Sequence, residues 1–179
     1  NRLLDDYSLS LDDPLLKSEM YSILGDVYHK LGEHKDSDQS YDFALEINPE
    51  YTIVLNNYSY YLALRGGLDN LLKAESMILK CLELTEGNKE PSFLDTYAWV
   101  LYQQGKEIGN KNTKLEKFTL SKKMMESCFQ NGGNSAVMYE HYGDILFQLN
   151  DISGAKTQWK EAFKKDQNNK NLKEKIDNL

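Results

Sequence analysis

Three side chains that could bind a metal ion lie close together near the C-terminal end of the sequence. Glu140, His141 and Asp144 fall within about one and a half turns of a predicted helix, and carboxylates and imidazoles are common metal ligands. The other two histidines, His29 and His34, are far from this group in the sequence. A solvated polar helix face explains the group more simply, so the sequence predicts no metal site.

Other residue patterns that carry chemistry are absent from the sequence. It contains no glycine-rich phosphate loop, no H-E-x-x-H, no G-x-S-x-G and no C-x-x-C. Cys81 and Cys128 fall within helical patterns, where we expect buried, unpaired thiols. We therefore predict that the protein is not an enzyme and that it uses no cofactor.

Composition indicates a soluble, mainly helical protein. Hydrophobic residues make up 40% and charged residues 27% of the 179 residues, and there are only three prolines. No apolar run approaches the roughly 20 residues of a membrane-spanning helix, so no transmembrane segment is predicted. Because the chain begins at Asn1, without an initiator Met or a signal peptide, we expect it to be a piece of a longer protein.

The sequence contains an internal repeat, and the candidate residues fall within it. In residues 18–51, Tyr21, Leu24, Gly25 and Tyr28 share one helical face, and Leu31-Gly32 ends that helix. A second helix carries Ser37, Tyr41 and Ala44, and Pro49 closes the unit. Similar spacing returns three times, with these residues at the matching positions: Leu55, Tyr58, Ser59, Leu62, Ala74, Ile78 and Cys81; Leu94, Tyr97, Ala98, Leu101, Ser121, Met125 and Cys128; Tyr139, Tyr142, Gly143, Leu146, Ala155, Trp159 and Ala162.

This pattern resembles the tetratricopeptide repeat, whose helix pair reads W-x2-L-G-x2-Y, then A-x3-F, a small residue and P. Tyr replaces Trp and Phe here, and Ser replaces the first Ala. The junction Asn131–Ser135 and the following Tyr-Glu-His-Tyr-Gly-Asp are similar to repeat proteins of Bacteroides-type bacteria. The resemblance implies an all-α fold, a right-handed superhelical solenoid of helix–turn–helix units.

The repeats divide the chain into consecutive segments within a single array. Residues 1–17 are either the end of a preceding repeat, which we favour, or the lead-in to the first unit, whose first helix opens near Pro14. The turn Arg65–Asn70 is longer than is usual in the family. The predicted segments are residues 18–51, 52–90, 91–135 with an inserted loop at 106–120, 136–167, and a capping helix at 168–179.

The resemblance also implies a binding surface. In this family the first helix of each pair lines a concave groove where extended peptides or partner helices dock. The positions that map to this groove combine aromatic anchors with acidic or amide groups. They are Asn56, Tyr60, Asp95, Trp99, Tyr102, Glu140, Asp144 and Phe147.

The predicted function is therefore a protein–protein interaction scaffold. The acidic residues Asp95, Glu140 and Asp144 favour a protein or peptide partner with basic and apolar character. The alternatives are a structural spacer or oligomerisation element of a larger chain with no ligand of its own, and a small-molecule or enzymatic role, which would need a convergent polar pocket.

Charge distribution bears on the remaining partners. Residues 1–105 carry 18 acidic and 8 basic side chains, and residues 106–179 carry 10 and 13. The acidic first part argues against nucleic acid as a partner. Six lysines between Lys106 and Lys123 are expected to lie in a solvated loop. The likeness to Bacteroides-type chains favours the cell envelope, as a periplasmic protein or a lipoprotein, over the cytoplasm.

Overall fold

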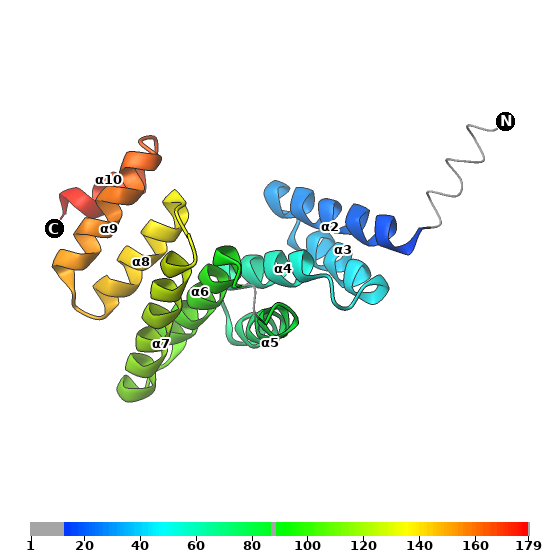
Figure 1. The fold of residues 1–179 in the computed structure, drawn as a ribbon, viewed down its shortest axis with the longest axis horizontal. Coiled ribbons are helices and arrows are strands. Elements are labelled where there is room, and N and C mark those ends of the chain that lie inside the picture. The colour runs from blue at the N-terminus through cyan, green and yellow to red at the C-terminus, as the bar shows by residue number, and fades with distance from the viewer. Residues whose placement is uncertain (1–12, 87–88, 179) are drawn as a thin grey trace.

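The computed structural model describes residues 13–86 and 89–178, and this part of the chain is all-α. Nine helices follow one another within it (Figure 1). Their bounds are α2 Pro14–Leu31, α3 His34–Ile47, α4 Thr52–Arg65, α5 Leu68–Leu84, α6 Pro91–Glu107, α7 Lys111–Gln130, α8 Ala136–Gln148, α9 Ile152–Lys165 and α10 Lys170–Asp177. The predicted fold class is confirmed.

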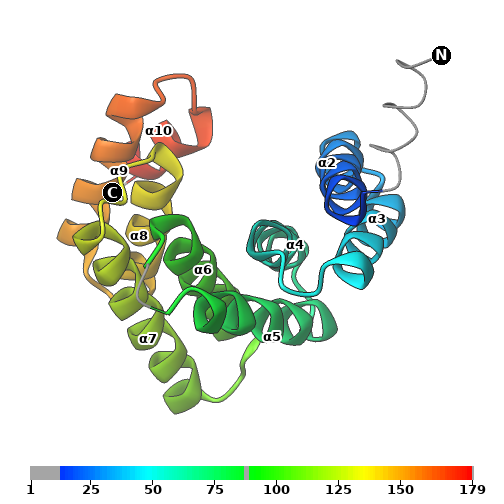
Figure 2. The same cartoon turned by 45° about the vertical axis from the view of Figure 1, so that its right-hand side comes forward.

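The helices pack as consecutive antiparallel pairs that stack into a curved array. α2 packs on α3, α4 on α5, α6 on α7 and α8 on α9, and contacts of α4 with α6 and of α7 with α8 join the pairs. Figure 2 shows α4 on the inside of the curve, with α5 and α7 toward its outside. α10 packs on α9 at the end of the array, where the capping helix is predicted.

Small residues allow the two helices of a pair to approach closely. A Cβ atom added to Gly25 would lie 2.7 Å from the ring of Tyr41, which is fully buried in α3. The Ser37 hydroxyl, also in α3, donates to the Gly25 carbonyl oxygen at 2.9 Å. Ser121 of α7 donates in the same way to Ala98 of α6 at 2.6 Å. The small positions of the repeat are therefore the crossing points of the helices.

Capping residues fix where the first helices start and stop. The Asp13 side chain accepts a hydrogen bond from the Leu15 amide at 2.9 Å, and Pro14 follows as the first helical residue. α2 ends at Gly32, which adopts a left-handed conformation with φ 80°. This start confirms the predicted opening near Pro14, whereas the prediction for the segment before it concerns residues 1–12, outside the described residues.

One apolar core runs along most of the array. It extends from Tyr41 in α3 to Ile145 in α8 without a break. A second cluster joins α8, α9 and α10 through Leu146, Trp159 and Leu172. The thiols of Cys81 and Cys128 are free and buried, as expected.

The predicted loop at 106–120 is wrong, because most of those residues are helical. α6 continues to Glu107 and α7 starts at Lys111, so only three residues separate them. The Asn110 side chain caps α7 by accepting from the amides of Asn112 and Thr113. Phe118 is 2% exposed and packs against Gly105, which anchors the added turns to the core.

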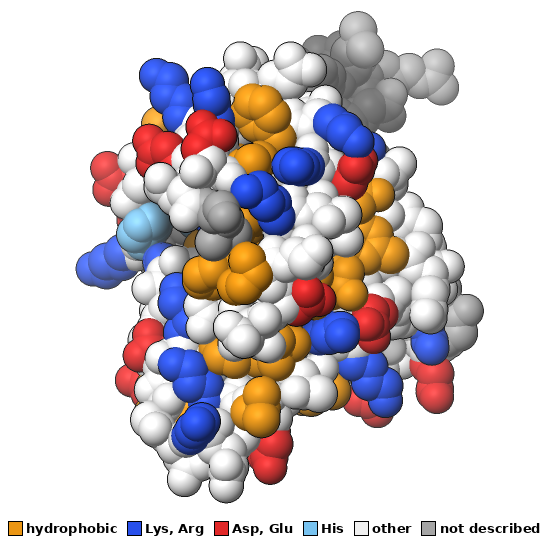
Figure 3. All heavy atoms as spheres, turned by 90° about the vertical axis from the view of Figure 1, so that its left-hand side faces the viewer, with side chains coloured by type: hydrophobic (Ala, Val, Ile, Leu, Met, Phe, Trp, Pro, Cys, Tyr) orange, Lys and Arg blue, Asp and Glu red, His pale blue; other side chains and the backbone are white. Residues whose placement is uncertain are grey.

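The lysines of this segment belong to a mixed surface. Lys117 of α7 forms an ion pair with Glu75 of α5, with 3.1 Å between Nζ and Oε1. On the face that carries the C-terminal half of the array, basic, acidic and apolar side chains are interspersed (Figure 3). The segment thus braces neighbouring helices instead of forming a separate basic loop.

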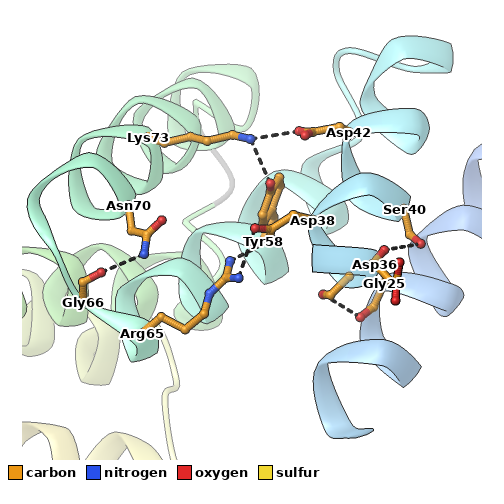
Figure 4. A network of polar contacts seen from close by, with 11 residues as sticks. Gly25, Asp36, Asp38, Ser40, Asp42, Tyr58, Arg65, Gly66, Asn70 and Lys73 are labelled. Atoms are coloured by element: carbon orange, nitrogen blue, oxygen red, sulfur yellow. Dashed lines mark hydrogen bonds and ion pairs between the residues drawn. The ribbon is translucent and has the colours of Figure 1, made fainter. Parts of the chain in front are cut away.

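The turn between α4 and α5 is also shorter than predicted. Only Gly66 and Gly67 separate the helices, with φ values of 67° and 81° that favour glycine. Asn70, expected in the turn, lies in the first turn of α5, and its side-chain amide donates to the Gly66 carbonyl at 2.8 Å (Figure 4).

Ion pairs connect the first two helix pairs. Arg65 at the end of α4 forms a two-pronged contact with Asp38 of α3, at 3.0 and 2.6 Å. Lys73 of α5 reaches both Asp42 of α3 at 2.9 Å and the Tyr58 hydroxyl at 2.8 Å (Figure 4). These contacts fix how α3 lies across α4 and α5.

Candidate functional site

The eight predicted groove residues lie on the first helices of three successive pairs. Asn56 and Tyr60 belong to α4, the next three to α6, and the last three to α8. Among the described residues, α4 contacts α6 and α6 contacts α8. The helices therefore bring the predicted positions into one neighbourhood.

The aromatic residues of the predicted groove form a stack, and most of this stack is buried instead of facing solvent. The Trp99 ring stacks on the rings of Tyr102 and His141, with centroid distances of 4.7 and 3.9 Å. The Tyr60 ring of α4 is tilted against the His141 ring, with their centroids 6.0 Å apart. Trp99 and Tyr102 are only 8% and 7% exposed, whereas Phe147 is 40% exposed. Half-buried Tyr60 and exposed Phe147 are the aromatic residues of the predicted set that present surface.

Asp95 is part of the packing between α6 and α8. Its Oδ1 lies 2.9 Å from His141 Nδ1, and both side chains are buried. This pairing satisfies the two polar groups where they are removed from water. Asp95 therefore contributes less open negative charge than the sequence suggested.

Asn56 ends a short polar chain across the first two pairs. Its side-chain amide donates to Asn57 at 3.1 Å, and Asn57 in turn donates to Asp26 of α2 at 3.5 Å. The Tyr41 hydroxyl also donates to Asp26. Within residues 13–86 and 89–178, the buried Oδ1 of Asn56 has no hydrogen-bond partner.

Glu140 and Asp144 lie one turn apart on α8, and both are paired with Lys175 of α10. Lys175 Nζ is 2.9 Å from Glu140 Oε1 and 2.7 Å from Asp144 Oδ1. Asn169 donates to the other Glu140 oxygen at 3.0 Å, and Trp159 Nε1 donates to Asp144 at 2.9 Å. The expected negative charge of the groove is therefore largely compensated at this end.

Burial governs the titration of this group. It raises the pKa of Asp144, an effect that the attraction and hydrogen bonds of Lys175 oppose. For Lys175, burial lowers the pKa, but the attraction of Asp144 and Glu140 outweighs burial and the net shift is upward. The lysine is thus held in its charged form by the two carboxylates.

Metal binding finds no support in these contacts. Glu140 and Asp144 pair with Lys175, whereas His141 pairs with Asp95. No group of three or more His, Cys, Asp or Glu residues in the described segments is arranged to hold a metal ion. Nor does any described helix have the length and apolar character needed to cross a membrane.

One pocket gathers several predicted residues, and we call it the C-terminal pocket. It has a volume of about 330 Å³. Its lining residues are Tyr102, Asp144, Phe147, Trp159, Lys175 and Asn178. The last three come from α9 and from the end of the chain, which the sequence reasoning did not assign to the site because the family map covers only first helices. The Leu172–Ile176 spacing could have indicated Lys175, since it places that residue on the helix that closes the array.

Comparisons with known proteins support the class of protein that the fold defines, an all-α solenoid of stacked helix pairs. The sequence model of the tetratricopeptide repeat family matches residues 18–51. Residues 18–51 therefore match a tetratricopeptide repeat, and the stacked helix pairs of the described chain have the fold of such repeats.

Its curated relatives are matched over less than half of their length. An uncharacterized protein, ycf37, of Pyropia yezoensis is 34% identical over 79 residues, which is 44% of this chain and 43% of the relative. The corresponding protein of Porphyra purpurea is 29% identical over 80 residues, 45% of this chain and 44% of the relative.

Solved structures show the same fold. Pseudomonas aeruginosa pilF matches with a TM-score of 0.64 and 18% identity, over 85% of this chain and 62% of that one. PilW, described as a widely conserved type IV pilus biogenesis factor, matches with a TM-score of 0.71 and 13% identity, over 97% and 76%. At such identities the likeness concerns the fold alone.

Proposed function

We propose that the protein is a non-enzymatic scaffold whose inner face binds an extended or helical segment of another protein. The tetratricopeptide fold supports this in general terms, because it presents the first helix of each pair on one continuous surface. The observation that carries the proposal is the C-terminal pocket, where the predicted groove residues Tyr102, Asp144 and Phe147 converge.

The pocket suits an apolar side chain with a basic end. Tyr102, Phe147 and Trp159 supply aromatic surface, which contributes strongly to binding at small entropic cost. Asp144 and the neighbouring Glu140 supply negative charge. Nucleic acid remains an unfavoured partner, and a cell-envelope location and a kinship with Bacteroides-type chains remain predictions.

The spacer function is the second candidate, and specific contacts favour it. Trp99 and Tyr102 are buried, and the chain's own Lys175 occupies the acidic positions. A scaffold without a ligand would fill its groove in this way.

Affinity capture from extract separates the two candidates. The test variant is Val137→Ser with Phe147→Ser, since both side chains are exposed and share with Glu140 and Asp144 one face of α8. The matched control is Leu79→Ser with Leu120→Ser, which changes equally exposed residues on the second helices α5 and α7. Circular dichroism should show that all three proteins fold.

A partner retained by the wild type and by the control but lost from the test variant would support the groove. If all three proteins capture the same set, or none captures a partner, the inner face is not a binding site and the spacer function takes first place.

A further inference from the structure

Lys175 is placed like the basic side chain of a ligand. Its Nζ contacts three carboxylate oxygens, at 2.9 Å on Glu140 and at 2.7 and 2.9 Å on Asp144. The same Nζ lies 5.7 Å from the centroid of the Trp159 ring, within the range of a cation–π contact. Acidic and aromatic groups thus surround one ammonium group.

This arrangement requires a cation. The Glu140 and Asp144 side chains are only 23% and 13% exposed, so two carboxylates one helical turn apart are partly removed from water. Without a positive charge between them, burial and mutual repulsion would disfavour their charged forms. Within residues 13–86 and 89–178, Lys175 is the cation paired with both.

The helix that supplies this cation is held by few contacts. α10 has eight residues, Leu172 is its one fully buried side chain among those described, and Ile176 is half-buried. A helix of this length has little stability of its own, because nucleation is costly and few backbone bonds follow it. Segments with few buried apolar contacts open at low free-energy cost.

We propose that α10 is a displaceable plug and that Lys175 occupies the site of a lysine or arginine side chain of the partner segment. Binding of that segment exchanges one cation for another, so Glu140 and Asp144 stay compensated while Tyr102, Phe147 and Trp159 pack against the incoming side chain. The inference rests on the proposed function and adds to it the chemistry of the partner and an autoinhibitory contact.

Peptide binding tests the plug directly. The probes are acetyl-Phe-Lys-Phe-amide and its neutral counterpart with norleucine in place of lysine, titrated calorimetrically into the full chain. The variant Lys175→Met removes the competing charge and keeps an unbranched apolar side chain. Lys173→Met is the control, because Lys173 lies exposed on the same helix and has no ion pair among the described contacts.

We expect Lys175→Met to bind the lysine probe about tenfold more tightly than the wild type does, the effect of one moderately strong interaction. Lys173→Met should bind like the wild type, and the norleucine probe should not distinguish the variants. Equal affinity of Lys175→Met and the wild type for the lysine probe would overturn the plug.

Hydrogen exchange provides a second measurement that needs no variant. Saturating lysine probe should accelerate amide exchange in α10 of the wild type, whereas unchanged exchange in the bound protein contradicts displacement. The two proposals fail separately. If Val137→Ser with Phe147→Ser loses a captured partner while both plug measurements are negative, the groove stands and the plug does not; if no partner is captured either, the proposed function itself falls.

Discussion

Gly25 in α2 faces the ring of Tyr41 in α3, and this contact sets how closely the first helix pair can pack. Gly25→Ala would normally favour a helix by up to about 1 kcal/mol. Here the new Cβ would lie 2.7 Å from a ring that is fully buried, so the ring or the helix must move. We expect a net loss of about 1–3 kcal/mol in the free energy of unfolding, as is usual for overpacking.

Urea denaturation monitored by circular dichroism measures this loss. Gly109→Ala is the control, since an added Cβ there meets no atom within 4 Å, and its effect should stay within about 0.5 kcal/mol. A Gly25→Ala protein as stable as the wild type would contradict this prediction, because it would show that the Tyr41 ring can move away from the new Cβ without a loss of stability.

Residue spacing predicted the packing within a repeat better than the contacts between repeats. Gly25 and Tyr41 could be assigned because the repeat requires a small residue where its helices cross. The Asp95–His141 contact was not predicted, because it joins side chains of different repeats. The spacing of residues within one repeat carries no information about such a contact. The contacts of Lys175 were not predicted for the same reason, because Lys175 lies on α10 and its partners lie on α8.

At the scale of elements, the residues inserted between the two helices of the third pair extend α7 instead of forming a loop. Phe118 anchors these first turns of α7: it is 2% exposed, and its ring centroid lies 5.7 Å from that of Tyr102. We expect Phe118→Ala to lower the free energy of unfolding by about 3–5 kcal/mol, the range for deleting a buried aromatic side chain.

The matched control for this variant lies two residues further along α7. Leu120 is 37% exposed, so Leu120→Ala should cost far less in the same urea denaturation. Similar losses for both variants would show that α7 does not depend on the Phe118 contact.

The sequence predicted a loop in this region because Gly109, Asn110 and Asn112 are poor helix formers. Asn110 instead serves as an N-cap, and Asn112 follows it inside α7. The same residue types favour a helix cap and a loop, so composition does not distinguish the two. The buried contact of Phe118 that makes this segment helical joins α7 to α6, and a sequence pattern does not show such a contact. Helix existence was therefore predictable here, whereas the extent of α7 was not.

At the scale of the whole molecule, the two ends of the array differ. α10 closes the C-terminal end through Leu172. At the other end, α2 exposes Met20, Leu24 and Val27 by 46%, 41% and 45%. The corresponding face of α4 is covered by α3, as the stacked rings of Tyr58 and Tyr41 show. Stacking thus buries each first helix against the preceding pair, and no described helix does so for α2.

Tyrosines occupy the core along most of this stack, which makes the stability of the array sensitive to alkaline pH. Burial raises the pKa of four of them to about 12: Tyr60, Tyr61, Tyr102 and Tyr142. It also raises the pKa values of the Cys81 and Cys128 thiols to about 12. An unfolded phenol has a pKa of about 10, so between about pH 10 and 12 the unfolded chain releases protons that the folded chain retains.

The stabilisation from the phenols is therefore complete below about pH 9 and is lost as pH rises through this window, by about 1.4 kcal/mol per pH unit for each proton released. The loss from the thiols begins at lower pH, because an unfolded thiol has a pKa of about 8.5. Urea denaturation at successive pH values should show a falling free energy of unfolding. Tyr102→Phe should reduce the slope, since one phenol no longer titrates. A constant free energy of unfolding up to pH 11.5, or a slope that Tyr102→Phe leaves unchanged, would contradict the burial of these phenols.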